Sequence, residues 1–402
     1  MKKFYLFFIT LLAQIMLLGC TKNTNVNIDN TALGNVEAEK IIEADISEEK
    51  EALKLIDKVE LEYATEFSID LYESGYASIH VTDGNSYVLV PKGHEEIILD
   101  DANATFIHMP CDSIYLAATS AMDLFRELDS LDYIKSCSTK AEDYDNNEVK
   151  NLIDANEISY VGKYSAPDYE KLVALNTSLA IESTMIYHSP KIKEELNGLG
   201  IPVLVERSSY EKEPLGRLEW IKLYGLLLGK SDLANEIFDK QVTNVNTVIN
   251  GLQNETKSNS KKPKVVFFYL SSNGYVNVRK PGDYVSKMIE IAGGEYALES
   301  LKIEEENALS TVNISWEDFY YYGKDADILI YNGTIDGGIE SVNDLINANE
   351  MFLEFKAIKD GRAYCMGSNM HQESSKVGEI IVELYSVINK SGEGLNYIKK
   401  VN

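Results

Sequence analysis

The sequence SDLANEIFDKQVTNVNTVINGL, residues 231–252, decides how the rest of the chain is organised. Ser231 is a favourable residue for the start of a helix, because its hydroxyl can accept a backbone N–H of the first turn. Apolar residues recur every three or four positions, at Leu233, Ile237, Phe238, Val242, Val245, Ile249 and Leu252. This spacing is typical of a helix with one buried face, and such a helix spans roughly 30 Å. We therefore predict one long helix over residues 231–257.

Short apolar strands alternate with helical segments on both sides of this helix. IYLAA, ISYVG, LAIE and IPVLVE precede it, and VVFFYL and ADILIYNG follow it. Repeated strand–helix units indicate parallel sheets with helices on their faces. We predict an α/β fold with two Rossmann-like lobes, residues 63–230 and 258–402, and a ligand cleft between them. Because the long helix is a single connection, we expect the lobes to move little relative to each other.

A different pattern precedes the first strand–helix unit. Residues 67–93, FSIDLYESGYASIHVTDGNSYVLVPKG, alternate apolar and polar side chains around Asp83-Gly84-Asn85, a typical turn sequence. This pattern predicts an extra β-hairpin or meander at the N-terminal side of the first lobe.

The N-terminus indicates export and lipid attachment. Lys2 and Lys3 precede an apolar run of signal-peptide length, and the run ends in LLGC. LLGC resembles the lipobox of bacterial lipoproteins, so we predict a signal peptide over residues 1–20 and lipidation of Cys20. Residues 21–62 are polar and acidic and are predicted to be a tether that passes into a short helix. The protein would then lie at the outer face of the cytoplasmic membrane, anchored by its lipid. A plain cleaved signal or a short anchor helix is the alternative.

Composition excludes several functions. The net charge of −26 argues against nucleic acid and against electrostatic docking on anionic lipid. Three cysteines remain beside Cys20, with no CxxC, and they are expected to be small buried thiols. With five histidines and no HExxH, we expect no resident metal and no cofactor. Without a GxSxG or a phosphate-binding loop, we expect no enzyme activity and no catalytic residue.

From Phe106 to Asn402 the chain resembles the class III substrate-binding proteins of ABC importers, the cobalamin and ferric-siderophore type. The stretches that carry the resemblance are SIYLAATSAMDLFRELDSLDYIKSCS, VGKYSAPDYEKLVALNTSLAIESTM, LGIPVLVERSSYEKEPLGRLEWIKLYGLLLGK and NGYVNVRKPGDYVSKMIEIAGGEY. Asn176-Thr177-Ser178 departs from the Pro-Asp usual in that region of the family. The resemblance implies two α/β lobes bridged by one long helix, with a metal chelate held between them.

The resemblance also implies how the protein meets its partner, the permease dimer of the importer. In the family, one acidic residue on each lobe pairs with arginines of the permease. The matching positions are Glu170 in PDYEKL and Glu317 in ISWEDF, each in the first turn of a predicted helix. Acidic residues also favour this position because they complement the helix dipole. We expect the binding protein itself to be a monomer.

The loops that follow the predicted strands supply the candidate ligand contacts. They are Thr119, Ser120, Lys163, Tyr164, Ser183, Thr184, Arg207, Tyr210, Tyr275, Arg279, Met370 and His371. Basic side chains among tyrosines suit a large anionic ligand such as a ferric siderophore, through charge-assisted hydrogen bonds and stacking. Each arginine could instead pair with a nearby acid such as Glu182 or Glu206. Haem or cobalamin as the ligand, and a sensor or adhesion lipoprotein that reuses the fold, remain alternatives.

Overall fold

The computed structural model describes residues 53–255, 261–303, 310–390, 392 and 395–402. The predicted signal peptide, Cys20 and the tether up to residue 52 lie outside the described residues. Within the part that is described, no helix combines the length and the apolar character needed to cross a membrane.

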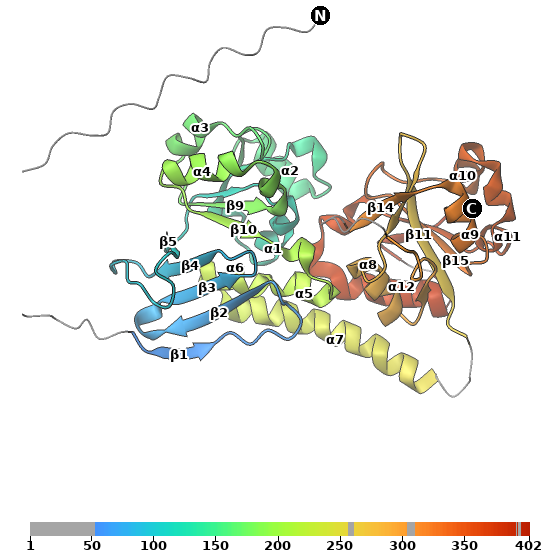
Figure 1. The fold of residues 1–402 in the computed structure, drawn as a ribbon, viewed down its shortest axis with the longest axis horizontal. Helices are drawn as coiled ribbons and strands as arrows, with labels where there is room; N and C mark the ends of the chain where they lie inside the picture. Colours follow the sequence, from blue (N-terminus) through green and yellow to red (C-terminus); the bar gives the residue numbers. More distant parts are fainter. Residues whose placement is uncertain (1–52, 256–260, 304–309, 391, 393–394) are drawn as a thin grey trace, which may run out of the picture. The chain divides into compact units, whose positions relative to one another are not determined.

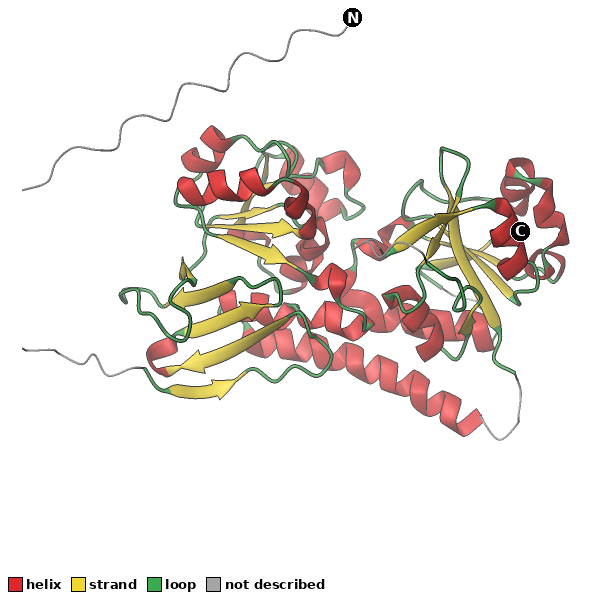
Figure 2. Ribbon diagram, viewed as in Figure 1, coloured by secondary structure: helices red, strands yellow, loops and turns green. Residues whose placement is uncertain are grey.

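The first element is a five-stranded sheet, the N-terminal sheet, with the strand order β1-β2-β3-β4-β5 (Figures 1 and 2). Its strands are Leu55–Lys58, Phe67–Tyr72, Ala77–Val81, Ser86–Val90 and Thr105–His108. The predicted hairpin is present as the antiparallel pair β3 and β4, and Gly84 supplies the positive φ of 88° that its turn requires. The sheet is larger than predicted. Pairing of β1 with β2 gives residues 55–58 a strand conformation where the sequence predicted a tether and a short helix, so sheet pairing outweighs local propensity there.

The N-lobe follows, with a parallel sheet in the order β10-β9-β6-β7-β8. Strands β6 to β10 are Ile114–Leu116, Ile134–Cys137, Ser159–Tyr160, Leu179–Ser183 and Val203–Glu206. Helices α1 to α6 are Met122–Glu127, Asn147–Asp154, Tyr169–Ala174, Pro190–Gly198, Pro214–Glu219 and Ile221–Leu227. Strands β6, β9 and β10 are buried along nearly their whole length, as expected for a parallel sheet with both faces covered.

The C-lobe sheet has the order β14-β12-β11-β15-β16-β17, with β13 beside β11. Strands β11 to β17 are Lys264–Leu270, Val276–Arg279, Glu295–Tyr296, Thr311–Ile314, Ile328–Asn332, Ala363–Met366 and Ile398–Lys400. Helices α8 to α12 are Tyr284–Ile291, Trp316–Gly323, Val342–Ala348, Lys356–Lys359 and Val377–Asn389. Its centre, β11-β15-β16, is parallel, whereas β12 and β17 run antiparallel to their neighbours. The sheet is therefore mixed.

The predicted long helix is α7, Ser231–Glu255. It packs against α6 of the N-lobe and α12 of the C-lobe (Figure 1). The helices α7 and α12 approach closely at Gly378, where an added Cβ would lie 2.5 Å from the backbone oxygen of Gln241. The buried Gln241 side chain donates to Glu379 and accepts its backbone N–H. Because helix α7 is fixed to both lobes, it sets their spacing.

The N-terminal sheet is fastened to the N-lobe through residues 62–66, the strap segment. The Glu219 carboxylate accepts the backbone N–H groups of residues 62, 63 and 64 at 2.8–2.9 Å. Glu211 accepts those of residues 65 and 66 at 2.9–3.0 Å. The strap segment lies directly on α5, since a Cβ on Gly216 would come within 2.8 Å of the Tyr63 carbonyl oxygen. Five successive backbone donors are thus satisfied by two carboxylates.

Candidate functional site

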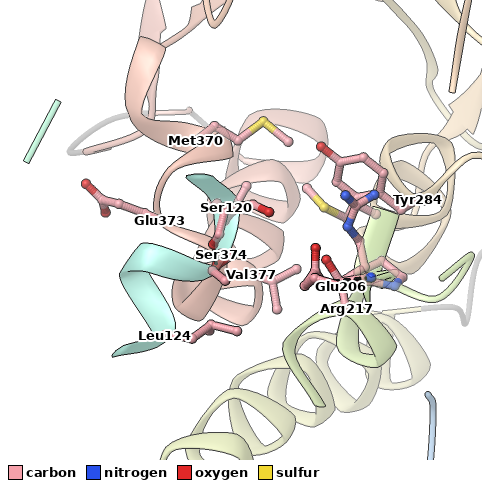
Figure 3. A pocket seen from close by; sticks show the side chains of 14 residues that line it. Ser120, Leu124, Glu206, Arg217, Tyr284, Met370, Glu373, Ser374 and Val377 are labelled. Carbon is pink, nitrogen blue, oxygen red and sulfur yellow. Dashed lines mark hydrogen bonds between the residues drawn. The ribbon is translucent and has the colours of Figure 1, made fainter. Parts of the chain in front are cut away.

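A cavity of about 160 Å³ lies between the two lobes. Residues of α1, of the end of β10 and of α5 form its N-lobe wall, and residues of α8, α12 and the loop after β16 form its C-lobe wall (Figure 3). Most of its lining is apolar, with Leu124, Met288 and Val377 among the contributing side chains. Strands β6 and β10 end at this cavity, which agrees with the expectation that ligands bind at the carboxyl ends of parallel strands.

Arg217 and Tyr284 bring the two lobes together at this cavity. The guanidinium carbon of Arg217, on α5, lies 3.9 Å from the ring centroid of Tyr284, on α8. Among the described residues, no carboxylate lies within ion-pair distance of Arg217. Figure 3 shows its guanidinium alongside the tyrosine ring. An arginine held by a cation–π contact, without a salt bridge, keeps its hydrogen-bond donors available for a ligand.

Glu206 supplies the buried acid of the cavity. It is the last residue of β10, it is 3% exposed, and one of its oxygens accepts the Ser208 backbone N–H at 2.7 Å. Burial raises the pKa of this carboxyl, and its hydrogen bonds from Ser208 and the charge of Arg217 act in the opposite direction. Among the described residues, one other acid lines the cavity, Glu373. Its carboxylate accepts from the Tyr397 hydroxyl and is turned away in Figure 3.

Arg279 lies behind Tyr284 and does not line the cavity. Its guanidinium carbon is 5.2 Å from the Tyr284 ring centroid, and its Nη1 is 3.9 Å from the Asp283 carboxylate. The buried Nε of Arg279 has no hydrogen-bond partner among the described residues. Its charge is therefore offset by Asp283, and its contact with a ligand would be indirect, through Tyr284.

Two of the residues predicted to contact the ligand line the cavity directly, namely Ser120 and Met370. Thr119 lies beside Ser120 and exchanges a hydrogen bond with Thr139 at 2.6 Å. Ser183 caps the turn after β9, and Thr184 lies 3.3 Å from the Ser209 hydroxyl. These two residues occupy the ligand edge of the N-lobe sheet without reaching the cavity.

Arg207 fastens the N-terminal sheet and does not line the cavity. Its guanidinium contacts the Glu66 carboxylate at 2.8 Å through both Nε and Nη2, and it donates to the Tyr187 hydroxyl at 2.9 Å. The Tyr210 ring lies against it, with 4.2 Å from ring centroid to guanidinium carbon. From the sequence, one interpretation of Arg207 was a structural salt bridge with Glu182 or Glu206. The structure shows a salt bridge, but its partner is Glu66.

The remaining predicted ligand residues lie outside the cavity wall. Lys163 is exposed, and Tyr164 packs partly against the apolar cluster of the N-lobe. Tyr275 is 51% exposed on the turn between β11 and β12. The His371 side chain lies outside the described residues. The structure therefore leaves most of the predicted ligand set as predictions.

Glu170 and Glu317 occupy matching positions in the two lobes. Both are exposed, and both lie in the first turn of a helix, α3 and α9, after the capping residues Asp168 and Ser315. This placement agrees with the one that the sequence predicts. The role of the two acids in docking stays a prediction.

The two lobes also meet through the segment after β16, residues 368–376, which we call the inter-lobe contact. The Gln372 amide accepts the Asp145 N–H at 2.8 Å and donates to the Asp143 carbonyl oxygen at 2.7 Å. Ser374 donates to the Ser120 carbonyl oxygen at 2.9 Å, and the Ser375 N–H donates to Asp123 at 2.9 Å. Ser374 and Ser120 both line the cavity, so the contact closes one of its sides.

Sequence reasoning missed Arg217 and Tyr284. Both lie inside helices, whereas the predicted ligand contacts were all taken from the loops that follow strands. Arg217 could have been noticed from the sequence, because it lies on the helix PLGRLE that follows the loop after β10. The three cysteines of the lobes are buried and unpaired, as expected, and no metal-binding group of acids, histidines and cysteines occurs among the described residues.

Sequence comparison shows the family. Residues 119–370, more than half of the chain, match the model of the periplasmic binding protein family. The chain therefore belongs to the periplasmic binding proteins. This family binds solutes for transport and is not enzymatic, which confirms the expectation that the chain is not an enzyme.

Two relatives come from the archaeon Methanocaldococcus jannaschii, and both are named uncharacterised lipoproteins. One is 28% identical over 230 residues, which cover 57% of this chain and 52% of the relative. The other is 25% identical over 299 residues, which cover 73% of each chain. The match thus spans about half of the first relative's length and most of the second's.

Solved structures share the fold. A periplasmic haem-binding protein of Pseudomonas aeruginosa superimposes with a TM-score of 0.56 at 15% identity, over 72% of this chain and 98% of that one. The periplasmic catecholate-siderophore binding protein of Vibrio cholerae gives 0.56 at 12% identity, over 77% and 99%. An ABC transporter substrate-binding protein of Listeria monocytogenes gives 0.51 at 15%, over 69% and 98%. These structures confirm the predicted class III fold, and at such identities they carry no information about the ligand.

Proposed function

We propose that the chain is the extracytoplasmic binding component of an ABC importer and that it captures a ferric chelate or a related metal–organic ligand. The cavity between the lobes carries the proposal. Both lobes contribute to it, and it is mainly apolar. Arg217, which has no ion-pair partner among the described residues, lies along Tyr284. A few convergent polar groups in an apolar cleft are the usual composition of a small-molecule site.

The size of the cavity implies that the lobes separate when the ligand enters. Small-molecule sites usually measure about 300–1,000 Å³, and this cavity is smaller, at about 160 Å³. The inter-lobe contact is the part that would open, because its hydrogen bonds join the lobes beside the cavity. Helix α7 would remain as the common support, so that the movement is small.

Titration of the full chain, purified in detergent, tests the binding proposal. Ferric chelates, haem and cobalamin would be added separately and followed by calorimetry. We expect saturable binding of a ferric chelate, and an Arg217→Gln variant should bind it roughly tenfold or more weakly, because a charge-assisted hydrogen bond is lost. Glu213→Gln, an exposed change in the same segment, is the control. If no ferric chelate binds and haem or cobalamin does, the iron-chelate assignment is wrong.

The permease is the proposed partner, and the lipid on Cys20 would hold the protein at the outer face of the membrane. Glu170 and Glu317 are proposed to meet arginines of the permease, one from each lobe. The double variant Glu170→Lys, Glu317→Lys should abolish uptake while ligand affinity is unchanged, since both side chains are exposed and remote from the cavity lining. Undiminished uptake in cells that express the double variant would remove these residues from the docking surface.

A further inference from the structure

The charges around the cavity indicate which class of chelate it accepts. Of the described residues that line it, three are charged, and Arg217 alone of these is positive. Glu206 faces the same space, as Figure 3 shows, and Glu373 contributes a second carboxyl to the wall. Arg279, which lies behind the lining residue Tyr284, is offset by Asp283.

This arrangement leaves at most one net positive charge from Arg217 and Glu206 for a polyanionic ligand. With Glu206 ionised, Arg217 and Glu206 balance each other. With Glu206 protonated, these two residues supply a single positive charge. Arg207, which the sequence suggested as a second ligand cation, is bound to Glu66 away from the cavity. The whole chain carries −26, and a surface of that sign opposes the approach of an anion.

The Glu206 carboxylate also requires a hydrogen-bond donor on the ligand. It is an acid at the end of a strand, in a mainly apolar cavity, and it is 3% exposed. A carboxylate in such a place accepts hydrogen bonds, and burying it against a ligand without donors is costly. The Ser120 hydroxyl, which also lines the cavity in Figure 3, can donate or accept and adds no charge.

We propose that the cavity selects a ferric chelate of zero or positive net charge that carries N–H donors, of the trihydroxamate type, and that Glu206 accepts a hydrogen bond from it. The trianionic tris-catecholate complexes are disfavoured. This inference rests on the proposed function, because it presupposes a ferric chelate in the cavity. It assigns Glu206 a role in specificity that is separate from the role of Arg217.

Two ferric probes of opposite charge test the inference. Ferrioxamine B is a cationic trihydroxamate complex, and ferric enterobactin is a tris-catecholate trianion. Each would be titrated into the full chain in detergent at low and high salt. We expect ferrioxamine B to bind roughly a hundredfold more tightly, because a like-charged surface strongly suppresses the wrong partner, and we expect salt to narrow the difference.

Variants then locate the selectivity. Glu206→Gln keeps the shape of the side chain and should weaken ferrioxamine B about tenfold, while the affinity for the trianion is unchanged or increased. Glu213→Gln removes an equal charge at an exposed position and should change neither affinity. Circular dichroism establishes that each variant is folded. If Glu206→Gln is not folded, the ratio of the two probes on the unsubstituted chain still decides the charge preference.

The outcomes separate the two proposals. Tighter or equal binding of ferric enterobactin would overturn the charge preference while the iron-chelate function stands. A preference for ferrioxamine B that Glu206→Gln does not alter would overturn the role of Glu206. Binding of haem or cobalamin but of neither probe would overturn the iron-chelate assignment and this inference with it. Binding of none of the four would overturn the proposed function as a whole.

Discussion

The strap segment and the inter-lobe contact are both polar junctions, and they differ in their chemistry. The strap segment is held by Glu211 and Glu219, which are 2% and 0% exposed. Their carboxylates accept the five successive backbone N–H groups of the strap segment. In the inter-lobe contact, the Gln372 amide and the Ser374 hydroxyl form neutral hydrogen bonds with backbone groups. One junction is therefore charge-assisted throughout and rests on two buried carboxylates. The other combines these neutral hydrogen bonds with the bond from the Ser375 N–H to Asp123 and a partly exposed ion pair between Lys376 and Glu127 at 3.1 Å.

This difference indicates which parts of the molecule move together. A buried carboxylate that loses its donors is left uncompensated in an apolar setting, so separating the strap segment from α5 would be costly. Neutral hydrogen bonds are exchanged for bonds to water at a small net cost. The N-terminal sheet should thus stay fixed to the N-lobe, while the lobes can part at the inter-lobe contact.

The largest effect is expected from breaking the strap junction. Glu219→Gln removes the charge that three backbone N–H groups and the Lys222 ammonium, 2.7 Å away, share. We expect a loss of about 3–5 kcal/mol in the free energy of unfolding, as for other disrupted buried ion pairs. Urea unfolding of the full chain measures it. The exposed change Glu213→Gln should cost less than about 0.5 kcal/mol; equal effects of the two would mean that the strap segment is not a strong junction.

Glu182 differs from Glu211 and Glu219, because no described residue donates a hydrogen bond to its buried carboxyl. It lies on β9, it is 0% exposed, and neither of its oxygens has a hydrogen-bond partner among the described residues. Burial raises the pKa of this carboxyl to about 8. Burial therefore disfavours the ionised form of Glu182, because Glu182 lacks the backbone N–H donors that Glu211 and Glu219 have.

The sign of the pH dependence follows. Below the ordinary carboxyl pKa of 4.5, Glu182 is protonated in both the folded and the unfolded chain. As the pH rises toward 8, Glu182 loses its proton in the unfolded chain but keeps it in the folded chain. The free energy of unfolding therefore falls. Relative to the unsubstituted chain, the free energy of unfolding of Glu182→Gln should therefore rise by about 4 kcal/mol between pH 5 and pH 9. Thermal unfolding of both chains at the two pH values measures this gain. If the stability difference between variant and unsubstituted chain is the same at pH 5 and pH 9, Glu182 is already ionised in the folded chain at pH 5.

The sequence predicted those features that depend on local periodicity. The long helix α7, the alternating strands and helices of both lobes, and the β3–β4 turn at Gly84 were all visible, because each is encoded by apolar spacing or by turn residues. Strand β1 was not, since residues 55–58 become a strand only by pairing with β2. Local patterns do not record pairing with a partner.

The site was predicted less completely, for a related reason. Ser120 and Met370, which line the cavity, were proposed because they follow strands, and the ligand edge of a parallel sheet is a property of topology. Their contact with a ligand stays a prediction. Arg217 and Tyr284 come from helices of different lobes, and only the packing of α5 toward α8 brings them within 3.9 Å. The ion pair between Arg207 and Glu66 could not be predicted, because the two residues are remote in sequence.

The smallest effect on stability is expected at the inter-lobe contact. Gln372→Ala removes the bonds to Asp145 and Asp143 and should cost about 1 kcal/mol or less, because both backbone groups can turn to water. Its effect on motion should be larger. Hydrogen exchange at the Asp145 amide should accelerate, whereas exchange at the Thr65 amide, held by Glu211, should not change.

The two amides report on the two junctions in one experiment. In the unsubstituted chain, the Asp145 N–H should exchange through separation of the lobes, and the Thr65 N–H only through a much larger opening. If Gln372→Ala accelerates both equally, the junctions open as one unit, and the strap segment takes part in lobe motion. If it accelerates only Asp145, the N-terminal sheet and the N-lobe move as one body against the C-lobe, and ligand entry needs no change in the strap segment.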